Sequence, residues 1–205
     1  FAAIRVDDEM EYQRVVEFVD KIFPNLVHRI KLHVKDTPIF DEYGIERELE
    51  RLLQHKVWLK SGGYLVVDEM EALTAIDINT GKQVGHTSLS DTILKTNLEA
   101  ADEVCRQLRL RDMGGIIVID FIDMESAADR KRLLDHFTEK LAADRARTRI
   151  GRVSSLGLVE ITRKRTGESV TEAITEICPT CAGRGRINSR DTVSLWVERD
   201  MRRML

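Results

Sequence analysis

Two aspartates and an asparagine are the side chains of this sequence best suited to hold a divalent cation. Asp77 and Asn79 end the strand-like run 72–79, and Asp120 follows an apolar run that begins at Ile116. Residues two apart on a strand share one face, so Asp77 and Asn79 are about 7 Å apart. If the two runs are neighbouring strands, Asp77 and Asp120 offer the hard oxygen ligands that Mg²⁺ or Mn²⁺ prefers. Such an ion could polarise a phosphodiester and help generate the attacking hydroxide.

The same acidic residues also fit a purely structural role. Asp77 and Asp120 could be strand-end residues whose carboxylates accept hydrogen bonds from backbone amides. Asp123 follows Asp120 closely, whereas Asp68 and Glu71 are weaker candidates because acidic residues are ordinary at turns. The pattern by itself leaves the catalytic and the structural interpretations open.

Cys178 and Cys181 form the most specific local motif, Cys-Pro-Thr-Cys followed by two glycines. Two thiolates at this spacing supply half of a tetrahedral zinc site. Cys105 is expected in the core, and no histidine is close in sequence. We therefore expect two chains to share one Zn²⁺ in a homodimer, with a redox-active dithiol as the alternative. Pairing into a dimer of dimers stays open. The motif also fits the DnaJ co-chaperones, but those need several copies.

The amino-acid composition limits the classes of protein to which this chain can belong. The chain has 205 residues, of which 42% are hydrophobic and 33% charged, and only 15 are proline or glycine (3 and 12). These values predict a folded domain rather than a disordered or fibrous chain. The apolar runs are far shorter than the roughly 18 residues of a membrane span. Three cysteines without a secretory signal predict a cytoplasmic protein, and the start at Phe1 suggests a piece of something longer.

The net charge of −3 averages segments of opposite sign. An acidic site beside basic walls suits a metal-dependent enzyme that acts on a polyanion, although solvated helix faces would look similar. The expected phosphate contacts are five basic residues of the C-terminal half: Arg145, Arg147, Arg163, Lys164 and Arg165. Arg109 and Arg111 are weaker candidates.

Hydrophobic periodicity predicts an α/β fold with a mixed sheet and flanking helices. Helices are expected over 8–23, 43–53, 90–108 and around 133–141, with Asp7 or Asp8 capping the first and Ser90 the third. Strands are expected over 30–34, 57–59, 64–68, 72–79, 116–121 and 156–162. The strands 64–68 and 72–79 should be antiparallel, and 81–90 should form a loop.

Five blocks, in this order, resemble the ribonuclease E/G family between about residues 28 and 190. They are GGYLVVDEMEALTAIDINT (62–80), TNLEAA (96–101), RQLRLR (106–111), GGIIVIDFIDM (114–124) and CPTC (178–181). The resemblance implies an endoribonuclease of RNA processing and decay that hydrolyses single-stranded RNA with Mg²⁺. It assigns Asp77 and Asp120 to the Mg²⁺, Asn79 to positioning at the scissile phosphate, and Cys178 and Cys181 to a shared zinc.

The resemblance also implies a domain organisation. Residues 1–62 would belong to a ribonuclease-H-like subdomain, 63–176 to a deoxyribonuclease-I-like catalytic subdomain, 177–187 to the zinc link, and 188–205 to the start of a small dimerisation domain. The family's RNA-binding barrel and 5′-sensing pocket would lie upstream of Phe1, so we expect weak binding and slow cleavage. Phe121 could stack a base or fill the core. The alternative function is a catalytically weak, zinc-linked RNA-binding module.

Overall fold

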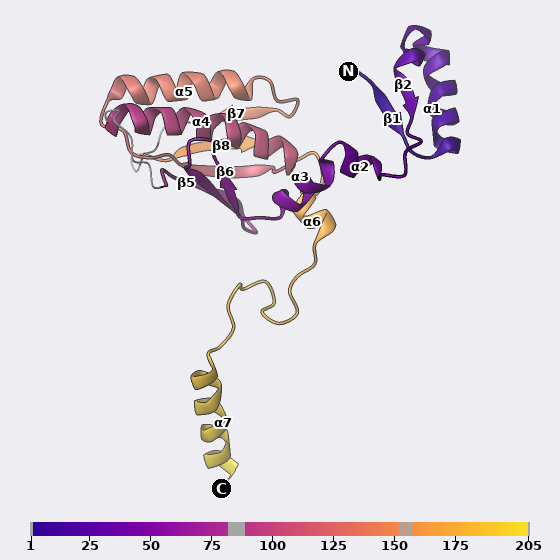
Figure 1. Ribbon diagram of the computed structural model, residues 1–205. Helices are drawn as coiled ribbons and strands as arrows, with labels where there is room; N and C mark the ends of the chain where they lie inside the picture. The colour runs from indigo at the N-terminus through magenta and orange to yellow at the C-terminus, as the bar shows by residue number, and fades with distance from the viewer. Residues whose placement is uncertain (1, 82–88, 152–153, 155–156, 205) are drawn as a thin grey trace.

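The computed structural model of the chain describes residues 2–81, 89–151, 154 and 157–204 (Figure 1). Its centre is a six-stranded mixed sheet with the strand order β3-β4-β5-β6-β8-β7. The strands are β3 (Lys56–Trp58), β4 (Tyr64–Glu69), β5 (Leu73–Asn79), β6 (Gly115–Asp120), β7 (Thr148–Ile150) and β8 (Val159–Arg163). Strands β5 and β6 are parallel, and the other neighbours are antiparallel. The predicted mixed α/β fold and the antiparallel pairing of 64–68 with 72–79 are confirmed.

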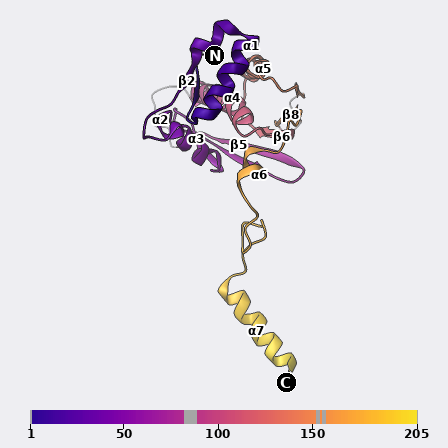
Figure 2. The same ribbon diagram turned by 90° about the vertical axis from the view of Figure 1, so that its right-hand side faces the viewer.

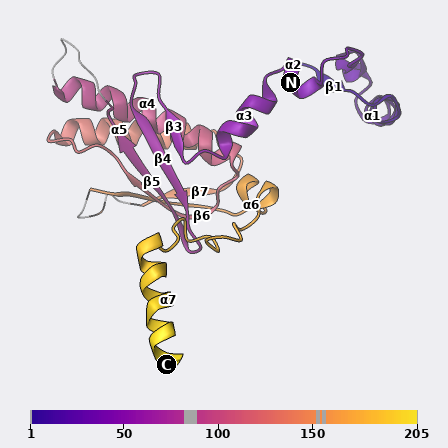
Figure 3. The ribbon, with the colours of Figure 1, turned by 60° about the horizontal axis from the view of Figure 1, so that its bottom comes forward.

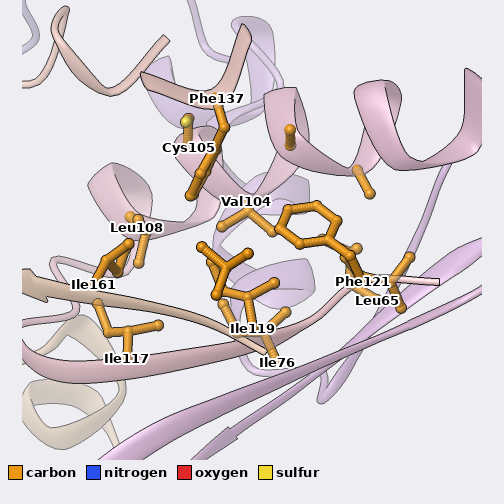
Figure 4. Close-up of a cluster of buried hydrophobic side chains, with 14 of the residues drawn as sticks. Leu65, Ile76, Val104, Cys105, Leu108, Ile117, Ile119, Phe121, Phe137 and Ile161 are labelled. Atoms are coloured by element: carbon orange, nitrogen blue, oxygen red, sulfur yellow. The ribbon is translucent and has the colours of Figure 1, made fainter. Parts of the chain in front are cut away.

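Two helices cover one face of this sheet, α4 (Leu89–Leu110) and α5 (Ala127–Leu141) (Figure 1). Between the helices and the sheet lies the core, in which Ile76, Ile117 and Ile119 of the strands meet Val104 and Leu108 of α4 (Figure 4). Each fully buried aliphatic side chain contributes roughly 1.5–3 kcal/mol to folding. Phe121 is buried and packs edge-on against Phe137 of α5, with ring centroids 5.8 Å apart. Of its two predicted roles, Phe121 therefore has the one in the core.

The opposite side of the sheet is called the open face below, and it carries exposed and half-buried side chains. Along β5, Thr74, Ile76 and Ile78 are buried, while the alternate residues point away from the helices. On β6, Ile116 is 52% exposed although it is a strand residue. The open face is therefore the surface on which the candidate site residues lie.

A smaller N-terminal unit precedes the sheet. Its β1 (Ile4–Val6) and β2 (Ile30–Leu32) are parallel, joined by α1 (Glu9–Ile22) and the 3₁₀ helix η1 (Pro24–Arg29). The predicted first helix is confirmed, with Asp8 as its cap: Asp8 accepts a hydrogen bond of 2.8 Å from the Glu11 N–H. The predicted helix over 43–53 is confirmed as α3 (Ile45–Leu52). A short helix that was not predicted, α2 (Ile39–Glu42), precedes it and is separated from it where Gly44 adopts φ +66°.

The C-terminal part contains α6 (Val170–Ile174) and α7 (Arg190–Met204), and α7 projects away from the sheet without burying any of its residues (Figures 2 and 3). Because α4 already includes Leu89, Ser90 lies within the helix, and the prediction that Ser90 caps it is wrong. Most of the predicted loop over 81–90, namely 82–88, lies outside the described residues. No helix of the described part is long and apolar enough to cross a membrane.

Candidate active site

Asp77 and Asp120 are directly paired across the parallel strands β5 and β6. Residues paired in this way point to the same face, and adjacent strands lie about 4.8 Å apart. Both side chains are exposed on the open face. The expectation that these two strands are neighbours is confirmed, and the two carboxylates can reach one small ion.

Asn79 lies two residues beyond Asp77 on the same face and contacts it directly. The Asn79 Nδ2 donates a hydrogen bond of 2.8 Å to Asp77 Oδ2. Asn79 is half-buried, so its amide has a defined place from which to hold the carboxylate. This bond limits the rotation of the Asp77 side chain and leaves it aimed along the open face.

The environment of Asp120 disfavours its charged form. Partial burial raises its pKa, and the nearby negative charges of Asp77 and Asp123 raise it further. A divalent cation between Asp77 and Asp120 would relieve the repulsion between the two carboxylates. Asp68, in contrast, contacts His55 Nδ1 at 2.9 Å, and Glu71 lies in the β4–β5 turn at the far end of the sheet.

The two carboxylates suit an open Mg²⁺ site better than a site in which the protein supplies all the ligands. Mg²⁺ commonly binds through one or two carboxylates and fills its other positions with water and substrate phosphate. Asp77 and Asp120 provide those two carboxylates, both of them exposed. Within the described residues, no group of three or more His, Cys, Asp or Glu side chains could hold a metal. Any ion held here would keep positions open for substrate.

The sequence interpretation assigned no role to Asn97, which anchors the segment after β6. Asn97 is fully buried on α4. Its Nδ2 donates to the Ile122 carbonyl at 2.8 Å, and its Oδ1 accepts from the Ile122 N–H at 3.1 Å. This pair of bonds fixes the backbone between Asp120 and Asp123. The signal in the sequence was an amide side chain among the mostly apolar residues that α4 buries.

The loop before β4 is fixed in a similar way. Glu99 of α4 accepts hydrogen bonds from the backbone N–H groups of Lys60 and Ser61, at 2.7 and 3.2 Å. Gly63 then passes so close to β5 that a Cβ on it would lie 2.7 Å from the Asn79 carbonyl oxygen. Only glycine allows this approach at position 63, and it brings the loop against the end of β5, whereas Gly62 has open space and instead adopts φ +89°.

The predicted basic residues lie at the other end of the sheet. Strand β8 runs antiparallel to β6, so Arg163 pairs with Gly115 rather than with the Asp120 end. Five residues of strand separate the two ends, about 16 Å. The Lys164 N–H donates to the Arg147 carbonyl at 2.9 Å, which places the segments of both residues at this distant end. Lys164 and Arg165 are exposed there, as are the remaining two arginines of the prediction, Arg145 and Arg147.

Arg163 requires a correction, because its guanidinium is used inside the protein. Its side chain is 4% exposed and forms ion pairs with Asp144 at 2.8 Å and Asp112 at 2.9 Å. It also donates to the Met113 carbonyl at 2.9 Å. A side chain engaged in this way cannot contact a phosphate, so Arg163 is structural. The run Arg163-Lys164-Arg165 gave no sign that its first member is buried.

Cys178 and Cys181 lie beyond the sheet in a turn, and neither forms a disulfide. The backbone N–H groups of Cys181 and Thr180 point at the Cys178 sulfur and lower the pKa of its thiol. Ala182, Gly183 and Gly185, which follow the two cysteines, adopt positive φ. Thiolates that accept backbone N–H groups suit Zn²⁺, and a tetrahedral zinc site would need two more ligands than this pair offers.

Comparisons with known proteins give the chain its family. A model of the Ribonuclease E/G family matches residues 1–166, so the match begins earlier than the expected residue 28. Ribonuclease G of Salmonella typhimurium is 47% identical over 201 residues, and that of Escherichia coli K12 is 46% identical over the same length. Each alignment covers 98% of this chain and 41% of the relative. Ribonuclease E of Haemophilus influenzae is 40% identical over 196 residues, which are 96% of this chain and 21% of that protein. The chain thus spans about two fifths of its ribonuclease G relatives, and it belongs to the ribonuclease E/G family.

Proposed function

We propose that the chain carries the catalytic centre of an endoribonuclease that hydrolyses single-stranded RNA with Mg²⁺. The observation that supports this most directly is the pairing of Asp77 with Asp120 on the exposed face of the sheet. The family membership gives the substrate class, and the names of the relatives are those of ribonucleases.

In this proposal Asp77 and Asp120 hold the cation, which supplies Lewis-acid activation of the phosphate and of a water molecule. Asn79 keeps the Asp77 carboxylate oriented through their 2.8 Å hydrogen bond and lies beside the scissile phosphate. Asn97 positions the segment that contains Asp120 and Asp123. Asp123 contributes negative charge that strengthens cation binding without being a ligand.

The RNA strand would lie across the open face. The four exposed basic residues, Arg145, Arg147, Lys164 and Arg165, would contact phosphates about 16 Å from the reacting one. They would therefore act on affinity rather than on the chemical step. Contacts to phosphate carry no sequence information, which fits a nuclease that tolerates many sequences.

A second proposal concerns assembly: Cys178 and Cys181 of two chains would share one Zn²⁺ in a homodimer. The backbone N–H groups aimed at the Cys178 sulfur support it, because such bonds stabilise a thiolate. The same link would exist in a catalytically weak RNA-binding module. Only a test of hydrolysis separates this alternative from the nuclease.

That test uses the 205-residue chain in excess over a 5′-labelled single-stranded oligoribonucleotide, with and without Mg²⁺. We expect cleavage in Mg²⁺ and a loss of at least about 10²-fold in rate for Asp77→Asn and for Asp120→Asn, the scale of one removed electrostatic group at a reacting centre. Glu71→Gln is the matched control, since Glu71 is acidic and exposed but lies at the far end of β5. Equal rates for the wild type and both aspartate variants would refute the nuclease assignment.

A further inference from the structure

Strand β3, at the edge of the sheet, adds an aromatic and a basic side chain to the open face. Trp58 pairs with Tyr64 of β4, and Tyr64 pairs with Asn79 of β5. These three residues form one row across the sheet. In the neighbouring row, Lys56 pairs with Val66, and Val66 pairs with Asp77. Figure 3 shows β3, β4 and β5 side by side. The edge strand is thus in register with the candidate active site.

Lys56, Trp58 and Tyr64 contact one another. The rings of Trp58 and Tyr64 are 5.3 Å apart between centroids and tilted by 59°. The Lys56 ammonium lies 4.2 Å from the Trp58 ring centroid and 3.5 Å from that of Tyr64. Attraction between the cation and both ring faces holds this group together. We call these three residues the edge cluster.

The edge cluster is poorly explained as packing. Trp58 is 63% exposed, whereas its neighbour Val57 points the other way and packs against the core. An exposed indole on an edge strand gives little hydrophobic stabilisation and invites unwanted association. An exposed aromatic ring beside a cation is, however, the usual platform for a base of a single-stranded nucleic acid and its phosphate.

We propose that the edge cluster is a nucleotide-binding subsite for the RNA strand whose scissile phosphate lies at Asp77 and Asp120. A base stacks on Trp58, and Lys56 contacts a phosphate of the same strand. The proposal rests on the proposed function and adds a substrate contact to it. Strand β3 is two strand spacings from β5, about 10 Å, so the stacked nucleotide is close to the scissile one along the RNA.

The chemistry of the edge cluster also predicts its selectivity. Stacking is tolerant of sequence because every base has an aromatic face, and Lys56 recognises only charge. The subsite therefore favours unpaired nucleotides over duplex, whose bases are stacked on one another. Residues of the sheet would thus contribute to the preference of the protein for single-stranded RNA.

Tryptophan fluorescence gives a test that is independent of cleavage. The sequence has two tryptophans, Trp58 and Trp196, so Trp196→Phe leaves Trp58 as the sole indole reporter. We expect a single-stranded oligoribonucleotide to quench Trp58 in this variant, and an abasic oligonucleotide of equal charge to quench it much less. In Trp58→Phe, the signal of Trp196 should not change. Absence of quenching at saturating RNA would overturn the proposal.

Affinity measurements complete the test. Trp58→Ala should weaken RNA binding about 10-fold, the scale of one lost base stack, and Trp58→Phe should restore most of it. Phe18→Ala removes an equally exposed aromatic (63%) from α1 and should leave binding unchanged. Lys56→Gln should reduce the slope of log affinity against log salt by about 0.7, the value for one phosphate contact on a single strand. Wild-type affinity in both Trp58→Ala and Lys56→Gln would refute the subsite.

The two proposals fail in different ways. If Asp77→Asn abolishes cleavage while Trp58 is not quenched, the nuclease proposal stands and the subsite is refuted. If Trp58 is quenched but Asp77→Asn cleaves normally, the binding surface stands and the catalytic assignment is refuted. For the cleaving protein, we expect Trp58→Ala to raise KM while kcat changes little, because the subsite binds the substrate equally well in its ground state and in the transition state.

Discussion

The side chain of Asn97 binds both the carbonyl and the N–H of Ile122, so one buried amide fixes the backbone between Asp120 and Asp123. Asp120 ends β6, and Asp123 lies in the segment that follows it. The geometry of the proposed metal site therefore depends on a residue of α4 that would never touch the metal.

Replacing Asn97 should impair the metal site before it unfolds the protein. Asn97→Ala leaves both polar groups of Ile122 without a partner in the interior, at a cost of about 1–3 kcal/mol. We expect a higher Mg²⁺ concentration for half-maximal cleavage, together with a lower thermal midpoint. Arg163→Met is the control that lowers stability at the other end of the sheet. A Mg²⁺ requirement that shifts equally in both variants would contradict a positioning role for Asn97.

Asp120 should be unfavourable for stability in the absence of metal. Its pKa is raised in the folded protein, so the fold holds the proton more tightly than the unfolded chain does and disfavours the charge at neutral pH. Asp120→Asn should therefore have a slightly higher thermal midpoint than the wild type in a chelating buffer, although we expect it to cleave RNA at least about 10²-fold more slowly. The difference should shrink as the pH falls through the pKa of Asp120. A clear loss of stability at neutral pH would argue that the carboxylate has a structural role.

The Arg163 ion pairs should control acid stability. Hydrogen bonds from Thr166 and Arg163 lower the pKa of Asp112. For Asp144, burial acts to raise the pKa, but hydrogen bonds from Arg163 and the Ala146 N–H more than offset it, and the net pKa is lowered. The stabilisation is therefore complete above the unfolded carboxyl pKa of about 3.9 and is lost as the pH falls further.

Removing one partner of this buried group should cost about 3–5 kcal/mol. We expect that loss for Asp144→Asn and for Arg163→Met in urea unfolding at neutral pH. Lys164→Gln is the matched control, because Lys164 is the exposed neighbour of Arg163. If Arg163→Met is as stable as the wild type, the attraction in the ion pairs merely offsets the free-energy cost of removing the charges from water.

The shared zinc predicts one ion per two chains. Metal analysis should give half a zinc per chain, and a chelator should convert dimers to monomers in analytical ultracentrifugation. Cys178→Ser and Cys181→Ser should have the same effect, whereas Cys105→Ala should keep the dimer. Burial raises the pKa of Cys105 to about 12, so a thiol reagent at neutral pH should modify only the other two cysteines. One zinc per chain, or none, would exclude the shared site.

The sequence predicted the residues whose position follows from strand periodicity. Asp77, Asn79 and Asp120 could be placed because alternation fixes their face, and the pairing of β5 with β6 confirmed their proximity. The sequence could not show that Arg163 points into the protein, since its ion-pair partners Asp112 and Asp144 are distant along the chain. The catalytic, metal-binding and RNA-binding roles of the site residues, including Asp77, Asn79 and Asp120, stay predictions.

Among the elements that the sequence prediction missed, β1, β7 and α6 are short. Strands β1 and β7 have three residues each, but so do β2 and β3, which were predicted, so length alone does not explain the difference. Helix α6 has five residues, and its start was visible in principle, because Ser169 and Glu172 form a capping box. The edge cluster depends on the register between β3 and β4, which only the fold establishes.

The parallel arrangement of β5 and β6 has a consequence for the newly made protein. Parallel neighbours need a crossover, and here α4 is the helix that lies between the two strands in the chain. A nascent polypeptide that has emerged only as far as Asn79 holds a single one of the paired acids. The proposed metal site can therefore form only after the crossover helix has been synthesised and β6 has paired with β5.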